Sequence, residues 1–227
     1  MTVNNPWKDQ ITPSKLFLDI DKPFLEAHNS IRIESPDHQL DFRPPPVPFL
    51  GFHNAPVVIL LANPGLDDDA NAIKESVKSP LFEPVKANLD TDGGTAHFAL
   101  GETFRDTPGG KWWRARTAKL GDEVGGFPVL AERLLAIELH GYHSKSWSAP
   151  LANFPSQEFS FYLVRKAIER GALIVIARSR NYWLAAVPEL LTYNNVIRET
   201  ISPRAVHLSE GNLGPIAYAK LVKALKD

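Results

Sequence analysis

The most regular feature of the sequence is a short, uninterrupted run of aliphatic residues at 57–62, which ends at Asn63-Pro64-Gly65. Continuous aliphatic runs of this length are typical of strands buried on both faces, as in the middle of a parallel sheet. Pro64 cannot donate to a strand ladder and Gly65 permits a positive φ, so we expect the chain to turn out of the sheet here. The amide of Asn63 would then stand at the strand edge where open α/β sheets bind ligands.

Three further hydrophobic runs, at 134–139, 172–177 and 205–208, predict three more strands, and each is followed by polar residues. Between the runs, apolar residues recur at helical spacing. We expect helices at 111–120, at 156–171 with Ser156 as the cap, from Asn181 to about residue 191, and at 215–226. Strands that alternate with helices pair in parallel through right-handed crossovers. The predicted fold is therefore α/β, a three-layer α/β/α sandwich around a central, mainly parallel, four-stranded sheet.

The two ends of the chain differ in regularity. Residues 1–50 are rich in proline and predict an irregular arm, with a short helix beginning near Pro13, packed on the rest of the protein. Residues 51–227 are expected to form a single α/β/α domain. Within it, residues 67–130 are punctuated by glycines that predict loops, and the acidic residues 67–69 favour a helix start because they complement the helix dipole.

Composition narrows the chemistry. Apolar residues make up 44% and charged residues 22% of the 227 positions, as in an ordinary globular protein. The chain has no cysteine, which excludes disulfides, thiolate zinc sites, iron–sulfur clusters and a cysteine nucleophile. We expect neither export nor membrane insertion, and hence a cytoplasmic protein. A formal net charge of −1 provides no overall attraction to nucleic acid, so any DNA binding needs a local basic face.

Polar residues follow all four predicted strands. Because the carboxyl ends of parallel strands share one edge, we expect residues 63, 140–144, 178–181 and 209–213 to converge into one pocket. Glu138 lies within an apolar run, where a carboxylate needs a partner or a role. Arg178 and Arg180 are candidate phosphate ligands at a strand exit, and Lys111 and Arg114 are basic neighbours of a tryptophan pair that could hold nucleic acid.

Here the residues resemble the uracil-DNA glycosylase superfamily, as a divergent member. Asn63-Pro64-Gly65 is similar to the first motif of its mismatch-specific branch, and Ser209-Glu210-Gly211-Asn212-Leu213 loosely resembles the last motif. His97-Phe98-Ala99 with Pro108-Gly109-Gly110-Lys111-Trp112-Trp113 is similar to the aromatic segment of that branch. The resemblance spans roughly residues 57–226.

The resemblance implies cleavage of the N-glycosidic bond of a damaged or mismatched base, flipped out of DNA, without metal or cofactor. Asn63 would orient a water, Phe98 or Phe82 would stack on the base, and Leu213 would wedge into the stack. Backbone N–H groups and a histidine would stabilise the departing base anion. The implied substrate-binding residues are Pro64, Gly65, Phe98, Glu138, His140, Tyr142, His143, Ser144, Ser209, Asn212 and Leu213.

Three departures from the family pattern change what is expected. Asn63 stands where the fastest branch carries an aspartate, so excision should be slow. Glu210 replaces a proline in the last motif, where a carboxylate would repel DNA phosphates. Glu138 and His140 occupy the strand end where the family often reads the base with an asparagine.

Other interpretations stay open at the level of sequence. The main alternative is a non-catalytic module that binds a nucleotide or a protein on the same fold. A metal phosphoesterase would use Asp67 or Asp68, although acidic helix starts are commoner than metal sites. Asn63 could simply cap a turn, and His140 and His143 could be structural. The oligomeric state is left open.

Overall fold

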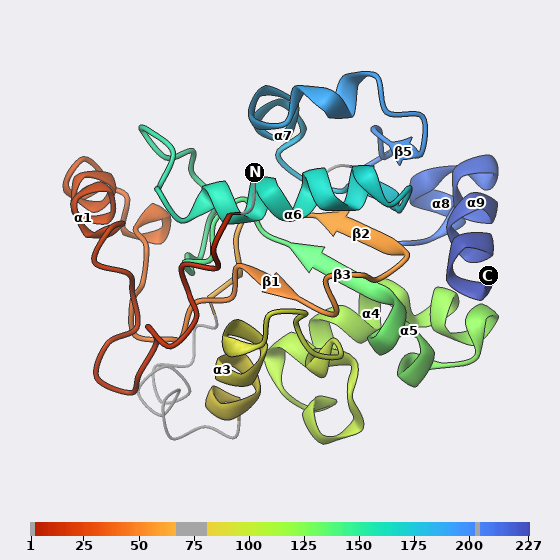
Figure 1. Ribbon diagram of the computed structural model, residues 1–227, viewed down its shortest axis with the longest axis horizontal. Coiled ribbons are helices and arrows are strands. Elements are labelled where there is room, and N and C mark those ends of the chain that lie inside the picture. The colour runs from red at the N-terminus through yellow and green to blue at the C-terminus, as the bar shows by residue number, and fades with distance from the viewer. Residues whose placement is uncertain (1–2, 67–80, 203–204) are drawn as a thin grey trace. The chain divides into compact units, whose positions relative to one another are not determined.

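Figure 1 shows the computed structural model of the protein, which describes residues 3–66, 81–202 and 205–227. The chain divides into two compact units. The first unit is Met1–Phe49, Ala62–Asp92 and Glu138–Tyr162, and the second is Leu50–Leu61, Gly93–Ile137 and Leu163–Asp227. The expected helix start at residues 67–69, and with it the candidate metal ligands Asp67 and Asp68, lies outside the described residues. The expectation of a single domain over 51–227 stays a prediction.

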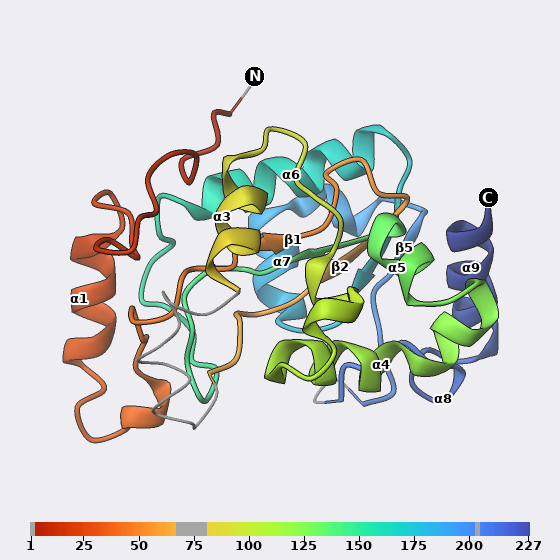
Figure 2. The ribbon, with the colours of Figure 1, turned by 90° about the horizontal axis from the view of Figure 1, so that it is seen from below.

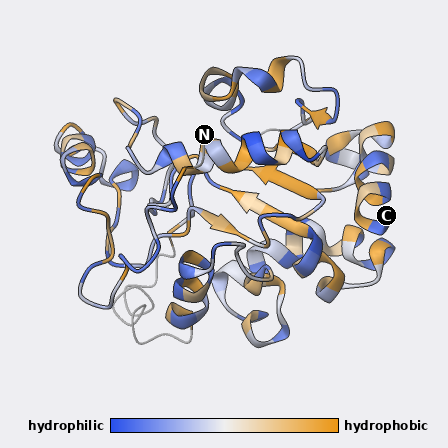
Figure 3. Cartoon of the chain, viewed as in Figure 1, coloured by the Kyte–Doolittle hydropathy of each residue, from blue (hydrophilic) through white to orange (hydrophobic). Residues whose placement is uncertain are grey.

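A sheet with the strand order β1-β3-β2-β4-β5 forms the core of the second unit. Strand β2 (Val57–Leu60) pairs in parallel with β3 (Leu134–Ile137) and with β4 (Leu173–Ile176), and β4 pairs in parallel with β5 (Val196–Ile197). Every residue of β2, β3 and β4 is buried, and the sheet is coloured largely as hydrophobic in Figure 3. The α/β class and three of the four expected strands are thereby confirmed.

The prediction of a fourth strand at 205–208 is wrong. Val206 and Leu208 are buried, but the backbone there is held by a turn, in which His207 N donates to Ala205 O at 2.8 Å. Leu208 N donates to Arg116 O, a helical carbonyl, at 2.9 Å rather than to a strand. The strand beside β4 is instead β5, which has only two residues.

The sheet also has an edge strand that the hydrophobic pattern does not predict, β1 (Phe49–Leu50). In the first unit, Glu138 N donates to Pro48 O at 2.9 Å. In the second unit, a Cβ on Gly51 would lie 2.1 Å from Leu134 O. Residue numbers therefore rise along β1 as they fall along β3, so this pair is antiparallel and the sheet is mixed.

The helices of the second unit follow the capping rules. Helix α4 (Pro108–Val124) begins with Thr107, whose side chain accepts from Gly110 N at 3.1 Å, and ends at Gly125 with φ 105°. It therefore extends the expected helix at 111–120 in both directions.

Figure 2 shows α4 on one side of β2 and β3, and the part of α6 in this unit on the other. The remaining helical segments are α5 (Phe127–Arg133), α7 (Arg180–Ala186), α8 (Glu210–Leu213) and α9 (Pro215–Lys226), with 3₁₀ turns η2 (Phe98–Leu100), η3 (Glu102–Phe104) and η4 (Pro188–Leu191).

The first unit contains the N-terminal segment, α1 (Lys22–Ser30), η1 (Pro36–His38), α3 (Phe82–Asp90) and the start of α6 (Gln157–Glu169). The prediction of a helix near Pro13 is wrong. Thr12 and Lys15 exchange backbone hydrogen bonds in a tight turn, and α1 begins only at Lys22. The segment is nevertheless well packed in this unit, since Trp7 is buried against Tyr142 with ring centroids 5.7 Å apart.

Helix α6 confirms the amphipathic pattern at 156–171, and Gly171 ends it with φ 78°. The expected cap is wrong, because the buried Ser156 hydroxyl has no partner among the described residues. The Gln157 side chain reaches back instead and accepts from Phe154 N at 2.6 Å, as in a capping box. The cap expected at Asn181 is also wrong, since α7 already begins at Arg180.

Within the described residues, no helix combines the length and apolar character that a membrane crossing requires.

Candidate functional site

The carboxamide of Asn63 lies just beyond the carboxyl end of β2, in the first unit. Its Nδ2 donates to Ser144 Oγ at 2.8 Å, to Pro64 O at 3.1 Å and to Tyr142 O at 3.3 Å. The structure therefore brings together the two strand exits that the sequence predicts to meet, those of β2 and β3. Their proximity follows from the parallel register, in which Leu60 pairs with Ile137.

The orientation of this amide is determined by the hydrogen bonds around it. Ser144 Oγ donates its single proton to Ser146 O at 2.9 Å, so it can only accept from Asn63. The two carbonyl oxygens likewise only accept. The group that faces all three must be the NH₂, and Oδ1 therefore points the other way. Among the described residues, nothing hydrogen-bonds to Asn63 Oδ1, so it remains a fixed acceptor.

Strand β2 ends at Leu60, so the chain has left the sheet by Asn63-Pro64-Gly65, as expected, although not through a positive φ at Gly65. Gly65 has no positive φ and forms a parallel bridge with Ser144. Leu66 N donates to Ser144 O at 3.1 Å. Backbone contacts therefore hold the chain on both sides of Asn63. Before it, Ala62 O accepts from His140 N at 3.3 Å, and after it lies the bridge between Gly65 and Ser144.

The His143 side chain also helps to hold the segment around Gly65. Its Nδ1 lies 2.8 Å from Gly65 O and its Nε2 lies 3.0 Å from Pro45 O. Burial lowers the pKa of His143, while the two carbonyl oxygens and the carboxylate of Asp41 oppose that shift. Both ring nitrogens face backbone carbonyl oxygens, of which a neutral imidazole can donate to one, so His143 positions this segment rather than presenting a free imidazole.

His140 and Tyr142 point into the interior of the first unit. His140 is 1% exposed, stacks on Trp147 at 5.4 Å between ring centroids, and has no hydrogen-bond partner for either ring nitrogen among the described residues. Burial, with smaller contributions from the charges of His28 and His143, lowers its pKa to about 3, so it is neutral at pH 7. Tyr142 is also 1% exposed and donates to Asp21 Oδ2 at 2.7 Å. Burial, followed by the charge of Asp21, raises its pKa far above the ordinary tyrosine value.

Two further expected site residues lie in the first unit. Glu138 is half-buried and its backbone N–H is bonded to Pro48 O. Phe82, considered as a stacking residue, begins α3 and is only 3% exposed. The roles that the sequence predicts for these two side chains stay predictions.

The expected turn at 209–213 belongs to the second unit and is held by one amide. Asn212 Oδ1 accepts from Ser202 N at 2.7 Å, while its Nδ2 donates to Ala205 O at 2.7 Å and to His207 O at 3.1 Å. Ser209 precedes α8 and its backbone O accepts from Asn212 N at 3.0 Å. Leu213 is buried at 8% exposure. In this conformation the Asn212 side chain holds the turn in place, and the Leu213 side chain is buried rather than exposed for insertion between bases.

The expected basic and aromatic residues of the second unit have different environments. Arg114 donates to Leu100 O at 3.0 Å and pairs with Glu102, with its guanidinium 4.3 Å from the Phe127 ring centre, so it holds η2 and η3. Phe98 packs edge-on to Phe104. Exposed Lys111 lies in α4, Arg180 pairs with Glu199 at 3.4 Å, and Arg178 is half-buried just after β4.

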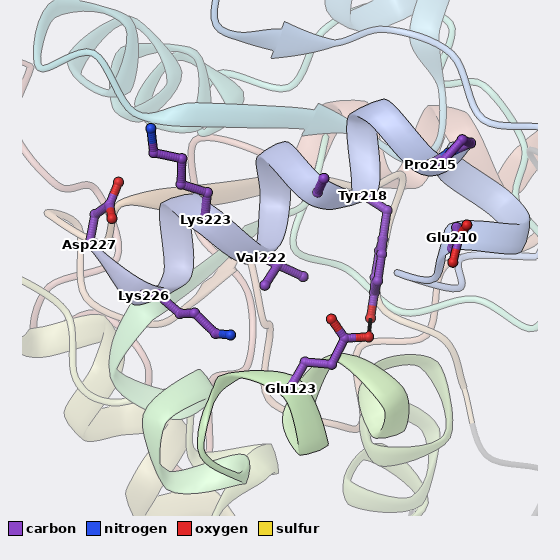
Figure 4. A pocket seen from close by; sticks show the side chains of 9 residues that line it. Glu123, Glu210, Pro215, Tyr218, Val222, Lys223, Lys226 and Asp227 are labelled. Carbon is purple, nitrogen blue, oxygen red and sulfur yellow. Dashed lines mark hydrogen bonds between the residues drawn. The ribbon is translucent and has the colours of Figure 1, made fainter.

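The second unit has two surface cavities that the sequence does not predict. One, of about 550 Å³, lies between α4 and α9, where Tyr218 donates to Glu123 at 3.0 Å, as Figure 4 shows. The other, of about 630 Å³, is lined by the segment after β1, Gly93, Gly94 and the end of α6. Of the residues that the sequence predicts to converge into a pocket, Glu210 lines the first cavity. Within the described part of the chain, no three acidic or histidine side chains are grouped so as to hold a metal ion.

The structure thus gathers Asn63, Pro64, Gly65, Tyr142, His143 and Ser144 in the first unit, and describes Phe98, Arg178, Ser209, Asn212 and Leu213 in the second. Convergence of residues 63, 140–144, 178–181 and 209–213 into one pocket stays a prediction. No protein-family model, curated protein or solved structure matches the chain. Function is therefore inferred from the geometry of the chain's own residues.

Proposed function

We propose that the protein is a uracil-DNA-glycosylase-like α/β/α protein that binds a nucleobase of DNA or of a nucleotide at Asn63 and hydrolyses its N-glycosidic bond slowly. The three-layer form of the fold and the assignment to that superfamily are parts of this proposal. The observation that carries it is the fixed carboxamide of Asn63, whose three donor contacts leave Oδ1 as an oriented acceptor.

An oriented acceptor is the group that this hydrolysis needs beside the sugar. The water oxygen attacks the anomeric carbon while the bond to the base nitrogen breaks, and the electron pair leaves with the base. Asn63 Oδ1 can accept a hydrogen bond from that water and hold it in line, which lowers the entropic part of the barrier. A rigid setting supports this role, because Ser144 and two backbone carbonyls hold the amide on its other side.

The same amide limits the rate. A carboxamide cannot take a proton from the water, so the proton leaves through solvent or through the substrate. General base catalysis contributes about 10²–10⁴-fold where it operates, and that contribution is missing if Asn63 is the group that orients the water. We therefore expect turnover that is measurable only with enzyme in excess over substrate.

The test is a single-turnover assay on duplexes that carry uracil, thymine opposite guanine, or hypoxanthine, with abasic sites revealed by alkaline strand cleavage. Wild type should form product on at least one duplex, and Asn63→Ala should slow it by about 100-fold, as loss of an oriented group typically does. The matched control is Asn153→Ala, an exposed asparagine of the same unit, which should cleave at the wild-type rate. Absence of product from wild type on every duplex would end the enzyme proposal.

A second candidate, a non-catalytic nucleotide-binding module, is favoured by one observation. Among the described residues, the hydrogen bonds of the Asn63 side chain involve a hydroxyl and two carbonyls, with no group that could act as a base. Binding of a base-modified duplex without product, weakened by Asn63→Ala and not by Asn153→Ala, would select this candidate. Equal binding by both variants would remove it as well.

A further inference from the structure

The His143 ring joins two segments of the first unit that are far apart in the sequence. Its Nδ1 lies 2.8 Å from Gly65 O, two residues after Asn63. Its Nε2 lies 3.0 Å from Pro45 O, in the proline-rich segment 43–48. Both distances are those of ordinary hydrogen bonds. The imidazole therefore links the proline-rich segment to the segment that carries the site amide.

The two contacts of the ring cannot both be hydrogen bonds while the ring is neutral. A neutral imidazole has one N–H and one lone pair, whereas an imidazolium has two N–H donors. Both partners of His143 are carbonyl oxygens, which only accept. In the neutral ring, one nitrogen lone pair therefore faces an oxygen lone pair at 3.0 Å or less, which is repulsive. The observed geometry matches the protonated ring.

The neighbouring segments contain few charges that act on this ring. Asp41 forms an antiparallel bridge with His143, and its N–H donates to His143 O at 2.8 Å. The Asp41 carboxylate favours the imidazolium, although its ion pair with Arg43 weakens that effect. The described residues around Asn63, 62–66, carry no ionisable side chain.

The ionisable residues on the same segment as His143 have other partners or no charge. Lys145 pairs with the aspartate of η1 at 4.0 Å, and His140 is neutral at pH 7. Burial outweighs the two carbonyls and Asp41, and it lowers the pKa of His143 below the ordinary value of 6.5. The ring is therefore neutral at pH 7 and gains its proton in acidic solution.

We infer that His143 is a positioning residue for the Asn63 site, and that protonation of its ring holds the proline-rich segment against the Asn63 segment. In the neutral ring the proton stays on Nδ1, because the contact with Gly65 O is the shorter one, and the contact with Pro45 O opens. In the protonated ring both contacts are hydrogen bonds, and the Asn63 segment is held more rigidly. The effect on hydrolysis rests on the proposed function of Asn63, whereas the link between the segments does not.

NMR spectroscopy of the intact protein tests the link without any substrate, over a titration from about pH 7.5 to about pH 4.5. The His143 ring should show one slowly exchanging N–H signal, from Nδ1, at the high end and two at the low end. Val47 N donates to Gly141 O just after the contact that opens, and Leu66 N donates to Ser144 O beside the contact that stays. The hydrogen-exchange protection of Val47 should therefore rise by about tenfold relative to that of Leu66 as the pH falls, because hydrogen bonds from charged groups are strong. Using this ratio removes any change in global stability.

Two variants provide the comparison. His143→Gln has its donors on a single nitrogen and does not titrate, so the ratio of the two protection factors should not change with pH. His207→Gln, which replaces an exposed histidine of the second unit, should behave like wild type. A constant ratio in wild type, which is decisive even if His143→Gln does not fold, would overturn the inference. The same change in His143→Gln as in wild type would also overturn it.

The single-turnover assay measures the consequence for the Asn63 site. The wild-type rate should rise by about tenfold as His143 is protonated, because a more rigid segment keeps the amide in its productive position. His143→Gln should lack this rise and show only the acid dependence of the duplex itself. If no duplex yields product, the proposed hydrolysis fails and the NMR result still decides the link. If the two pH profiles coincide while the NMR signals change as expected, the positioning role of His143 is refuted.

Discussion

The substitution Asn63→Asp tests the orientation of the site amide most directly. It changes one NH₂ group into an oxygen without changing the shape of the side chain. In the wild type that NH₂ faces Ser144 Oγ at 2.8 Å and two carbonyl oxygens at 3.1 and 3.3 Å. A carboxylate there would place oxygen against oxygen at both carbonyls. Only the Ser144 hydroxyl could turn to donate, and Ser146 O would then lose its bond.

The expected cost follows from these contacts. Loss of the donor contacts removes a net stabilisation of about 1–2 kcal/mol, because each intramolecular hydrogen bond is worth about 0.5–1.5 kcal/mol and Asn63 is only half-buried. Repulsion between the carboxylate and the two carbonyls adds about 1 kcal/mol on the same scale. We therefore expect Asn63→Asp to lower the free energy of unfolding by about 2–3 kcal/mol, and Asn63→Ala by about 1–2 kcal/mol.

Urea unfolding followed by tryptophan fluorescence measures both values, with Asn153→Asp as an exposed control that should stay within about 0.5 kcal/mol of wild type. The penalty of Asn63→Asp should shrink in acid. The carbonyls raise the folded-state pKa of the introduced carboxyl, so the native state binds its proton more tightly and stability is regained as the pH falls through that pKa. If Asn63→Asp is as stable as wild type, or more stable than Asn63→Ala at pH 7, the amide does not have the orientation described.

Three further outcomes are expected, each measurable by urea titration. Gly110→Ala should destabilise the protein by about 2 kcal/mol or more, because the new Cβ would lie 1.9 Å from Phe104 O, whereas Gly109→Ala, with no atom within 4 Å, should be neutral or slightly stabilising; equal effects would contradict the packing at α4. Asn212→Ala should cost about 2–3 kcal/mol, because it removes three hydrogen bonds made by a buried side chain, and a loss below about 0.5 kcal/mol would refute the role of Asn212 in holding this turn. Burial lowers the folded-state pKa of His140 to about 3, below the unfolded value of 6.5, so stability is lost as the pH falls below 6.5. His140→Phe should therefore reduce the loss between pH 6.5 and 4 by about 3 kcal/mol, at 1.36 kcal/mol per pH unit, and an unchanged pH slope would exclude His140 as the cause.

The elements that the sequence predicts correctly are those whose pattern repeats often enough to be recognised. Strands β2, β3 and β4 are uninterrupted aliphatic runs, and α6 and α9 keep an apolar stripe over three or more turns. Strands β1 and β5 have two residues each, too few to show any period. The run at 205–208 imitates a strand because its buried apolar side chains alternate, although its backbone bonds go to a turn and to α4.

The candidate site was predictable only as far as strand order could be inferred. Parallel neighbours place Asn63 beside the 140s segment, and the structure confirms that pair of exits through the Asn63–Ser144 bond. The inward direction of Tyr142 and the burial of His140 could not be predicted, since the groups that cover them, Trp7 and Phe154, come from remote parts of the chain.

Asn63 and Asn212 show why residue type alone does not separate a functional amide from a structural one. Both follow hydrophobic segments, and each fills a motif position in the resemblance. Asn212 uses its donor and acceptor groups on three backbone partners, so a ligand could reach it only by breaking the turn that it holds. Asn63 uses only its NH₂, and that NH₂ is fixed on one side so that Oδ1 is left for something else. The unused hydrogen-bonding capacity of a rigidly held side chain, rather than the motif, is therefore the physical reason to propose a function for residue 63 and not for residue 212.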